Sequence, residues 1–338
     1  MATIESPRQP NPVLIFEGIQ AYQRSAALQA AIELELFTAI AAGNRTADVI
    51  AKTASASSRG IRILCDYLTV QGFLSKNGDQ YSLTPESAIF LDKKSPAYFG
   101  TTVRFLLDPR MLAAYLNLTD IIRTGKTVTE KGSVAPENPI WIEFARSMAP
   151  MMRPTAEEIA TVVAGESELR VLDIAAGHGL FGIAILKQNP KARVTAVDWP
   201  NVLAVATENA KNAGVADRHA TRPGDAFDVD FGGPYDLVLV TNFFHHFDQQ
   251  ECERLMRKIF AALLPGGRCV TLEFIPNDDR VSPPIPAAFA MNMLANTPSG
   301  DVYTFAQLEN MFRNAGYASS KLHPLMKSPE SIVISTKA

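Results

Sequence analysis

An acid and two closely spaced glycines, Asp173, Gly177 and Gly179, form the part of the chain best suited to bind a ligand. They follow an apolar run that begins at residue 171, and a helix-like pattern over 181–187 comes directly after them. This order predicts a buried strand, a tight turn and a helix N-terminus, where a nucleoside-bearing ligand can contact bare backbone. Glycine is favoured in the turn because a side chain would block that approach.

The acids of this region help to separate two classes of ligand. Residues 177–182 also fit the G-x-G-x-x-G pattern of dinucleotide-binding proteins. Asp173, however, gives the pattern D-x-x-x-G-x-G, with an acid placed to take the ammonium end of S-adenosylmethionine. The next strand pattern, 193–197, ends on Asp198, roughly where an acid reaches a ribose in such βαβ units. S-adenosylmethionine is therefore the predicted cofactor.

Further polar residues follow the later strand patterns. Residues 224–227, Gly-Asp-Ala-Phe, suit a purine ring, although an ordinary Gly-Asp turn is the alternative. The strand pattern 235–240 runs into His245 and His246, and Glu273 lies in the strand pattern after it. Ligands of doubly wound sheets bind at the carboxyl ends of the strands. The residues expected to converge there are Asp173, Asp198, Asp225, His245 and Glu273.

The composition is typical of a globular protein. With 338 residues, 47% of them hydrophobic, the chain can bury a large core and is expected to form two domains. A net charge of -3 gives no sign of a polyanionic partner, and no apolar run is long enough to span a membrane. The three cysteines lack metal-type spacing, so reduced thiols in a cytoplasmic protein and no metal are expected. Residues 1–12, polar and proline-rich, predict a disordered tail rather than a secretory signal.

Residues 13–100 predict a winged-helix domain. Three helical patterns within 27–72 are followed by two strand-like pieces around Asn77-Gly78, a strong hairpin turn. A winged helix that reads DNA needs a basic surface, whereas the third helix and the hairpin here carry acids beside their few basic residues. Packing or dimerisation is therefore favoured over DNA binding.

Residues 101–165 predict a helical connector, with two of its helices over 140–152 and 155–163. Its methionines, among them Met148 and Met151, could face a ligand, although methionines at helical spacing more often pack in a core. From residue 166 to residue 338 strands and helices alternate, which predicts a Rossmann-like parallel sheet. The fold class expected for the chain is α/β.

With these motifs placed, nearly the whole chain resembles the S-adenosylmethionine-dependent O-methyltransferases of the plant caffeate and flavonoid type and their bacterial natural-product relatives. The motifs that carry the resemblance are the winged-helix region, the loop 173–179, Val197-Asp198-Trp199-Pro200, residues 224–227, and Leu264-Pro265-Gly266-Gly267-Arg268. The resemblance implies a winged-helix dimerisation domain, a class I methyltransferase domain and a homodimer. It also implies a small acceptor with an aromatic or enolic hydroxyl, and neither nucleic acid nor membrane as a partner.

The resemblance further implies roles for single residues. Asp198 would hold the ribose, residues 225–227 the adenine, and the loop 173–179 the methionyl part. The full predicted cofactor set is Asp173, Ala175, Gly177, Gly179, Asp198, Trp199, Gly224, Asp225, Ala226, Phe227, Thr241 and Asn242. The predicted acceptor set, under a roof over 283–296, is Met148, Met151, Phe289, Asn292 and Met293.

By the same resemblance His245 takes the place of the general base and Glu273 that of the acid that orients it. A histidine with an ordinary pKa near 6.5 is suited to accept the hydroxyl proton. His246 stands where relatives have an aspartate, so either imidazole could be the base, and a metal on the pair is an alternative. Val302 falls in the place of a second acid, with Asp301 beside it, and His178 replaces a small residue.

Two other functions stay open at this point. The altered acids at His246 and Val302 allow a relative that binds S-adenosylmethionine but methylates carbon, decarboxylates or hydroxylates. The second open function is a winged-helix regulator with a ligand-sensing domain. The weakly basic third helix is evidence against it. The predicted activity is O-methyl transfer.

Overall fold

The computed structural model describes residues 10–127, 132–135 and 137–338. The chain forms two compact units, residues 1–103 and 104–338, each with its own hydrophobic core. Of the tail predicted at 1–12, residues 1–9 lie outside the described part. None of the helices in the described part combines the length and the apolar character needed to cross a bilayer.

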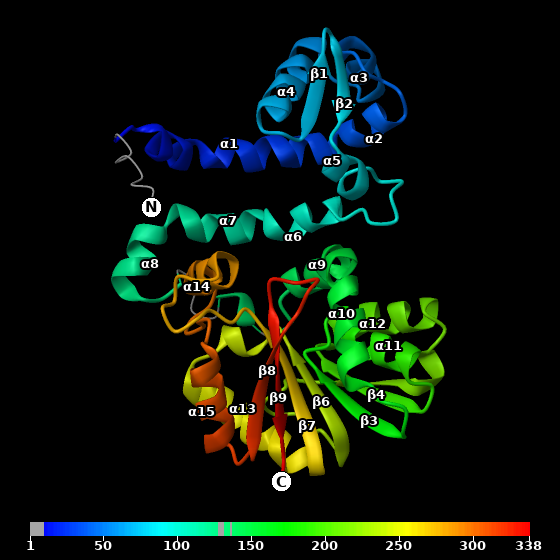
Figure 1. Ribbon diagram of the computed structural model, residues 1–338, viewed down its shortest axis with the longest axis vertical. Coiled ribbons are helices and arrows are strands. Elements are labelled where there is room, and N and C mark those ends of the chain that lie inside the picture. Colours follow the sequence, from blue (N-terminus) through cyan, green and yellow to red (C-terminus); the bar gives the residue numbers. More distant parts are fainter. Residues whose placement is uncertain (1–9, 128–131, 136) are drawn as a thin grey trace, which may run out of the picture. The chain divides into compact units, whose positions relative to one another are not determined.

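The first unit is mostly helical and carries one hairpin (Figure 1). Its elements are α1 (Val13–Glu33), α2 (Leu36–Ala41), α3 (Ala47–Thr53), α4 (Ser58–Val70), β1 (Leu74–Asn77), β2 (Gln80–Leu83) and α5 (Pro85–Phe90). Gly78, with φ +60°, turns β1 into the antiparallel β2. Lys76 of the hairpin and Arg62 of α4 both bind Asp66, at 2.6 and 3.1 Å. These basic side chains are thus already paired within the unit.

The second unit opens with helices. They are α6 (Val103–Leu106), α7 (Pro109–Leu116), α8 (Leu118–Thr124), α9 (Ile140–Ser147) and α10 (Ala149–Val163). The break expected near residue 154 lies instead at Met148, between α9 and α10. Pro150 stands in the first turn of α10, where a missing N–H is tolerated, and Pro154 lies inside the same helix.

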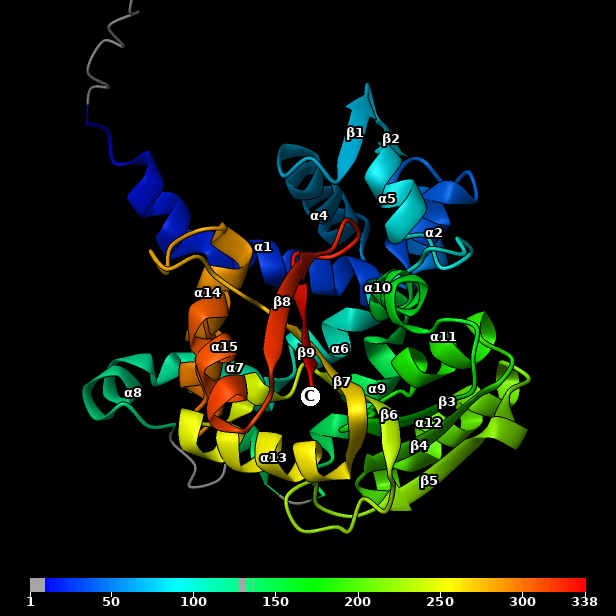
Figure 2. The same ribbon diagram turned by 60° about the horizontal axis from the view of Figure 1, so that its bottom comes forward.

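The rest of the second unit is a seven-stranded sheet in the order β5-β4-β3-β6-β7-β9-β8. Its strands are β3 (Leu169–Ile174), β4 (Ala192–Asp198), β5 (His219–Pro223), β6 (Tyr235–Thr241), β7 (Leu263–Glu273), β8 (Ser319–Pro324) and β9 (Ser331–Thr336). The first five are parallel, while β9 pairs antiparallel with β7 and β8, as Figure 2 shows. The chain order reverses between β3 and β6, and in such sheets ligands bind at that point.

Helices cover both faces of this sheet. Figure 1 shows α10, α11 (Leu180–Gln188) and α12 (Pro200–Asn212) on one side, and α13 (Gln249–Ala262) and α15 (Phe305–Asn314) on the other. Alternate strand residues face opposite sides: Leu237 and Leu239 of β6 pack in one core cluster, and Val238 and Val240 in the other. The predicted α/β fold with a Rossmann-like sheet is confirmed.

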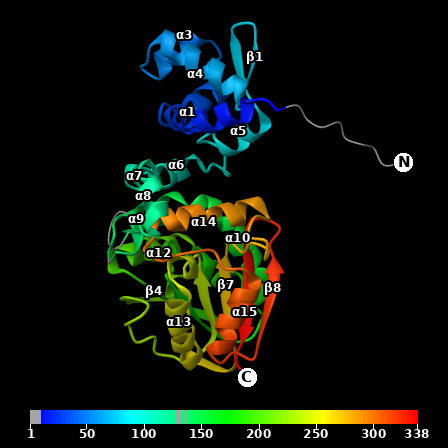
Figure 3. The same ribbon diagram turned by 90° about the vertical axis from the view of Figure 1, so that its left-hand side faces the viewer.

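One more helix closes the carboxyl end of the sheet. Figure 3 shows α14 (Pro284–Asn296) lying across that end, and it packs on α7 and α8. It coincides with the roof predicted over 283–296. The finer division into a connector, 101–165, and a cofactor domain from residue 166 stays a prediction.

Candidate active site

A cavity of about 370 Å³ lies in the second unit, bounded by the loops after β3, β4, β5 and β6 and by α9, α10 and α14. It lies at the point where the order of the strands reverses. Most of the residues predicted for a site line its wall: Ala175, Gly177, Asp198, Trp199, Gly224, Asp225, Ala226, Phe227, Thr241, Asn242, His245, His246, Met148, Met151, Phe289, Asn292 and Met293. Three predicted site residues lie behind the wall: Asp173, Gly179 and Glu273.

The turn after β3 brings backbone to the cavity. Gly177, with φ +57°, lines the wall in the left-handed conformation that favours glycine. Gly179, with φ +72°, has the same conformation, and in addition a Cβ there would lie 2.9 Å from the Cβ of Ala206 on α12. The structure thus shows tight packing of α12 against the turn at Gly179, and a contact of this residue with the cofactor stays a prediction.

Asp173 lies at the end of β3, fully buried beneath the turn. Its Oδ2 accepts a hydrogen bond from the N–H of Gly182 at 3.2 Å, and its Oδ1 has no partner within the described residues. Burial raises the pKa of Asp173 to about 7. Its contacts anchor the start of α11, and its contact with the ammonium end of the cofactor stays a prediction.

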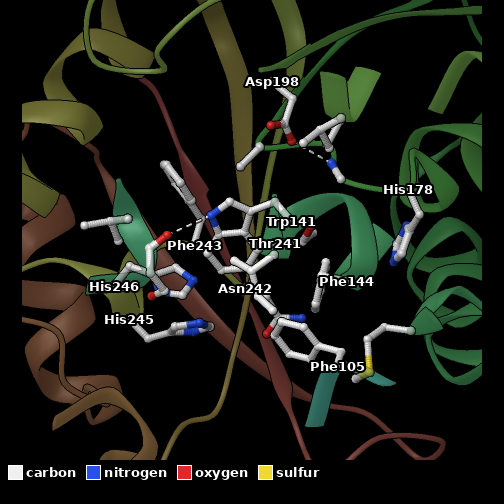
Figure 4. A pocket seen from close by; sticks show the side chains of 18 of the residues that line it. Phe105, Trp141, Phe144, His178, Asp198, Thr241, Asn242, Phe243, His245 and His246 are labelled. Atoms are coloured by element: carbon white, nitrogen blue, oxygen red, sulfur yellow. Dashed lines mark hydrogen bonds between the residues drawn. The ribbon is translucent and has the colours of Figure 1, made fainter. Parts of the chain in front are cut away.

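Asp198 lies on the wall at the end of β4, as Figure 4 shows. It accepts hydrogen bonds from the N–H groups of Gly177 at 2.8 Å and Trp199 at 2.7 Å. Burial raises its pKa to about 6, and those two N–H groups lower it in part. The carboxyl group therefore joins the two loops and has acceptor capacity left for hydroxyl groups in the cavity.

Residues 224–227 form the wall after β5. Asp225 accepts a hydrogen bond from the N–H of Phe227 at 2.8 Å, which closes the turn. The ring of Phe227 packs edge-on to Phe247, with centroids 4.9 Å apart, and the guanidinium of Arg254 lies 4.5 Å from its centroid. A fixed aromatic ring and a carboxyl group therefore lie next to each other on this part of the wall.

A histidine and an acid are joined at the other end of the cavity. The Nδ1 atom of His245 lies 2.5 Å from Oε2 of Glu273. The Oε1 atom of the same carboxylate accepts hydrogen bonds from the N–H groups of Phe243 at 3.1 Å and Phe244 at 2.8 Å. Glu273, at the end of β7, therefore fixes both the turn before His245 and its imidazole.

His246 lies beside His245, with ring centroids 4.4 Å apart, and Figure 4 shows both imidazoles pointing toward the middle of the pocket. Its ring meets Trp141 edge-on at 5.2 Å, and its Nδ1 has no partner within the described residues. Burial, and then the neighbouring His245, lower the pKa of His246 well below 6.5. Within the described residues, no group of three or more His, Cys, Asp and Glu side chains is arranged to hold a metal ion.

Comparison with known proteins agrees with this arrangement. Residues 132–318 match the O-methyltransferase domain, and residues 16–93 match the O-methyltransferase dimerisation domain. The chain belongs to the O-methyltransferase family. It is an S-adenosylmethionine-dependent enzyme, as the resemblance predicted, and the dimerisation domain supports a homodimer.

Three relatives illustrate the likeness. A crystal structure from Nostoc punctiforme, assigned as an O-methyltransferase, is 48% identical, with a TM-score of 0.95 over 97% of this chain and 100% of that one. The 3-hydroxy-5-methyl-1-naphthoate 3-O-methyltransferase of Streptomyces sahachiroi is 29% identical over 92% of this chain and 90% of its own. Human N-acetylserotonin methyltransferase, solved with S-adenosylmethionine, shares the fold at 19% identity, with a TM-score of 0.85 over 100% of both chains.

The wall of this methyltransferase fits its cofactor on three observations. Gly177 keeps the wall free of a side chain, Asp198 offers a carboxyl group between two loops, and Phe227 offers a fixed ring. They lie at or just after the ends of β3, β4 and β5, which are neighbours in the sheet.

The rest of the cavity wall of the methyltransferase is mainly aromatic and apolar. Trp141 and Phe144 of α9 meet edge-on at 5.7 Å, and Phe289 of α14 meets His245 edge-on at 5.0 Å. Asn292 accepts a hydrogen bond from the hydroxyl of Tyr115 at 3.2 Å. Wall residues that were not predicted include Phe105, Trp141, Phe144 and Asn296. The apolar spacing of Trp141 and Phe144 on one helix was the signal available for two of them.

The position of the missing acid is also explained. Val302 is buried, and Asp301 accepts two hydrogen bonds from Arg280 at 2.9 Å near the surface, away from the wall. A buried carboxyl group that was not predicted, Glu330, lies just before β9. Burial raises its pKa, an effect that the side chains of Ser328 and Asn242 offset in part.

Proposed function

We propose that this methyltransferase moves a methyl group to the hydroxyl of a small, uncharged aromatic metabolite, with His245 as the general base. When bound, S-adenosylmethionine supplies an electrophilic methyl group on a sulfonium. The observation that carries the proposal is the pair His245–Glu273: His245 lies on the cavity wall, and the carboxylate of Glu273 behind it holds Nδ1 of the imidazole.

The pairing supports one tautomer of His245. The carboxylate of Glu273 accepts a hydrogen bond from the Nδ1–H of His245. The proton of the neutral imidazole therefore stays on Nδ1, and Nε2 keeps its lone pair. Nε2 can then take the proton of the acceptor's hydroxyl group. At the same time the hydroxyl oxygen forms a bond to the methyl carbon, and the bond between that carbon and sulfur breaks. The carboxylate stabilises the imidazolium that results. Alignment of oxygen, carbon and sulfur in the cavity supplies the rest of the rate enhancement.

The charges of the wall support an uncharged acceptor. Within the described residues, the charged side chains other than histidine on this wall are Asp198 and Asp225, and no lysine or arginine lines it. An acceptor with a carboxylate or phosphate would find no cation there, and burial of an unpaired charge is costly. The aromatic rings of Trp141, Phe144 and Phe289 favour a flat apolar body.

We also propose the cofactor contacts that the wall supports. Asp198 would accept hydrogen bonds from the ribose hydroxyls, Asp225 would bond the adenine amine, and Phe227 would pack against the ring. The backbone of Ala175 and Gly177 would contact the methionyl part, with Trp199, Gly224, Thr241 and Asn242 completing the site. Met148, Met151, Asn292 and Met293 would surround the acceptor together with Phe289.

The test combines a variant with product analysis. His245→Ala should lower kcat by about 100-fold or more, since loss of general-base help costs at least that much, while the affinity for S-adenosylhomocysteine in titration calorimetry stays within about twofold. Labelled S-adenosylmethionine with 2-naphthol should give an O-methyl ether, whereas 3-hydroxy-2-naphthoate should react far more slowly. Normal turnover by His245→Ala would refute the base, and a carbon-methylated product would refute the reaction.

A further inference from the structure

A buried imidazole stands on the cavity wall between the two glycines of the turn after β3. His178 is 2% exposed, and the pocket view places it across the cavity from His245 and His246 (Figure 4). Its ring lies parallel to that of Phe144, with centroids 6.1 Å apart and planes at 16°. Asn209 of α12 donates to its carbonyl oxygen at 2.9 Å, which fixes the backbone. The side chain is thus held in one place.

The hydrogen bonds of this imidazole define its tautomer. The N–H of Leu180 donates to Nδ1 of His178 at 3.2 Å, so Nδ1 carries no proton. Burial, and then the charge of Arg153, lower the pKa of His178 to about 4, so the ring is neutral at pH 7. Its single ring proton is therefore on Nε2. That atom is buried and has no partner within the described residues. A buried donor without an acceptor is uncommon in folded proteins and raises their free energy.

The surroundings of Nε2 favour an anion as its acceptor. His178 directly precedes Gly179 and Leu180, where α11 begins, and the N-terminus of a helix carries partial positive charge. The cofactor brings a carboxylate into a cavity whose described wall holds no lysine or arginine. The N–H donors of the wall can receive that carboxylate, and Nε2 of His178 is a buried donor that lacks an acceptor, within reach of the positive charge of Arg153 behind the wall.

We propose that His178 donates a hydrogen bond from Nε2 to the carboxylate of the methionyl part of S-adenosylmethionine. This rests on the proposed function, in which the turn 175–177 contacts that part of the cofactor. His178 is then a specificity residue: it favours nucleosides that carry the amino-acid chain over those that lack it. With a small residue at this position, the carboxylate would lose this donor and would form a hydrogen bond with water instead.

Binding of two ligands tests the role directly, by titration calorimetry without any acceptor. S-adenosylhomocysteine carries the amino-acid chain, and 5′-methylthioadenosine has the same adenosine and thioether without it. His178→Phe keeps a ring but removes the hydrogen-bond donor. It should lower the affinity for S-adenosylhomocysteine by about 10- to 100-fold, as loss of a hydrogen bond to a charged group does. Its affinity for 5′-methylthioadenosine should stay within about twofold. His178→Gln, which retains an N–H donor, should restore most of the S-adenosylhomocysteine affinity.

A second variant separates this proposal from the proposed site. Asp198→Asn should lower the affinity for both ligands, because both carry the ribose. If Asp198→Asn changes the affinity for neither ligand, the proposed cofactor site is wrong, and the proposed role of His178 is wrong as well. If Asp198→Asn behaves as expected but His178→Phe leaves both affinities unchanged, or weakens both equally, the site stands and the role of His178 is overturned.

Discussion

The two ends of the cavity hold the same side chain in opposite chemical states. At one end, the Nδ1 of His245 faces a carboxylate oxygen of Glu273, so the free nitrogen is an acceptor. At the other end, the Nδ1 of His178 faces the N–H of Leu180, so the free nitrogen is a donor. A residue type alone therefore does not define its chemistry. The partner of one ring nitrogen decides whether the other nitrogen takes a proton or donates a hydrogen bond.

The electrostatic surroundings agree with this difference. The Glu273 carboxylate can stabilise a positive charge on His245. Burial, and then the charge of Arg153, oppose protonation of His178, whose Nδ1 accepts a hydrogen bond from a backbone N–H. One end of the cavity is suited to hold a proton during the reaction, and the other end is suited to stay neutral.

The largest effect is expected when the partner of His245 is reversed. In Glu273→Gln, the amide oxygen can still accept from Phe243 and Phe244, while the amide N–H₂ turns toward Nδ1. His245 would then carry its proton on Nε2, as His178 does, and could no longer act as a base. We expect kcat to fall by about 1,000-fold or more, because a wrong histidine tautomer has a cost of that order.

Binding separates this effect from damage to the fold. The affinity of Glu273→Gln for S-adenosylhomocysteine should remain within about threefold of the wild-type value. Turnover within threefold of wild type would mean that the tautomer of His245 does not matter, and the comparison between the two ends would lose its basis.

The neutral state of His178 should be visible in the pH dependence of stability. An unfolded histidine titrates near 6.5 and the folded His178 near 4, so the unfolded state binds more protons between these values. Stability is therefore complete above pH 6.5 and is lost as the pH falls, by about 2 kcal/mol at pH 5 and about 3 kcal/mol in all. His178→Gln should lack this loss.

Urea unfolding at pH 8 and pH 5 measures the difference. The raised pKa values of Asp173 and Asp198 act in the opposite direction, but both proteins contain them and they cancel in the comparison. An equal change in unfolding free energy between the two pH values in both proteins would show that His178 is not held neutral by the fold.

The sequence predicted the features that depend on neighbouring residues. Strand, turn and helix follow one another around Gly177, and Asp198 ends the next strand, so local patterns were enough to place both on the cavity. The roof over 283–296 also corresponds to a real helix, α14. The α/β fold follows from the same alternation of patterns.

Features that depend on packing between distant segments could not be predicted. Besides its φ of +72°, Gly179 has no room for a side chain because of Ala206, 27 positions along the chain and on another helix. The N–H that sets the tautomer of His178 comes from the way the turn closes on α11. Asp301, next to the missing acid in sequence, pairs with Arg280 instead, and Glu330 is buried beside Asn242, 88 positions away in the chain. Periodicity carries no information about such pairings.

A smaller effect is expected from the second imidazole. His246 is buried, its Nδ1 has no partner within the described residues, and its lowered pKa keeps it neutral. It therefore resembles His178 rather than His245, and His246→Asn should lower kcat by less than about tenfold, since it does not carry the proton. Steady-state kinetics with the acceptor used for His245→Ala measures this. A loss as large as that of His245→Ala would make His246 the base and move the reactive end of the cavity to its ring.

The smallest effect is expected at Asp301, the acid that the sequence placed beside the missing one. Its ion pair with Arg280 is nearly half exposed, with side-chain exposures of 45% and 38%, and such pairs contribute at most about 1 kcal/mol. Asp301→Ala should therefore leave kcat within about twofold and change the unfolding free energy by less than about 1 kcal/mol. If instead kcat fell as far as in Glu273→Gln, two acids would act on His245. The contrast between the two ends of the cavity would then depend on a network of carboxylates, and a single hydrogen-bond partner would not account for it.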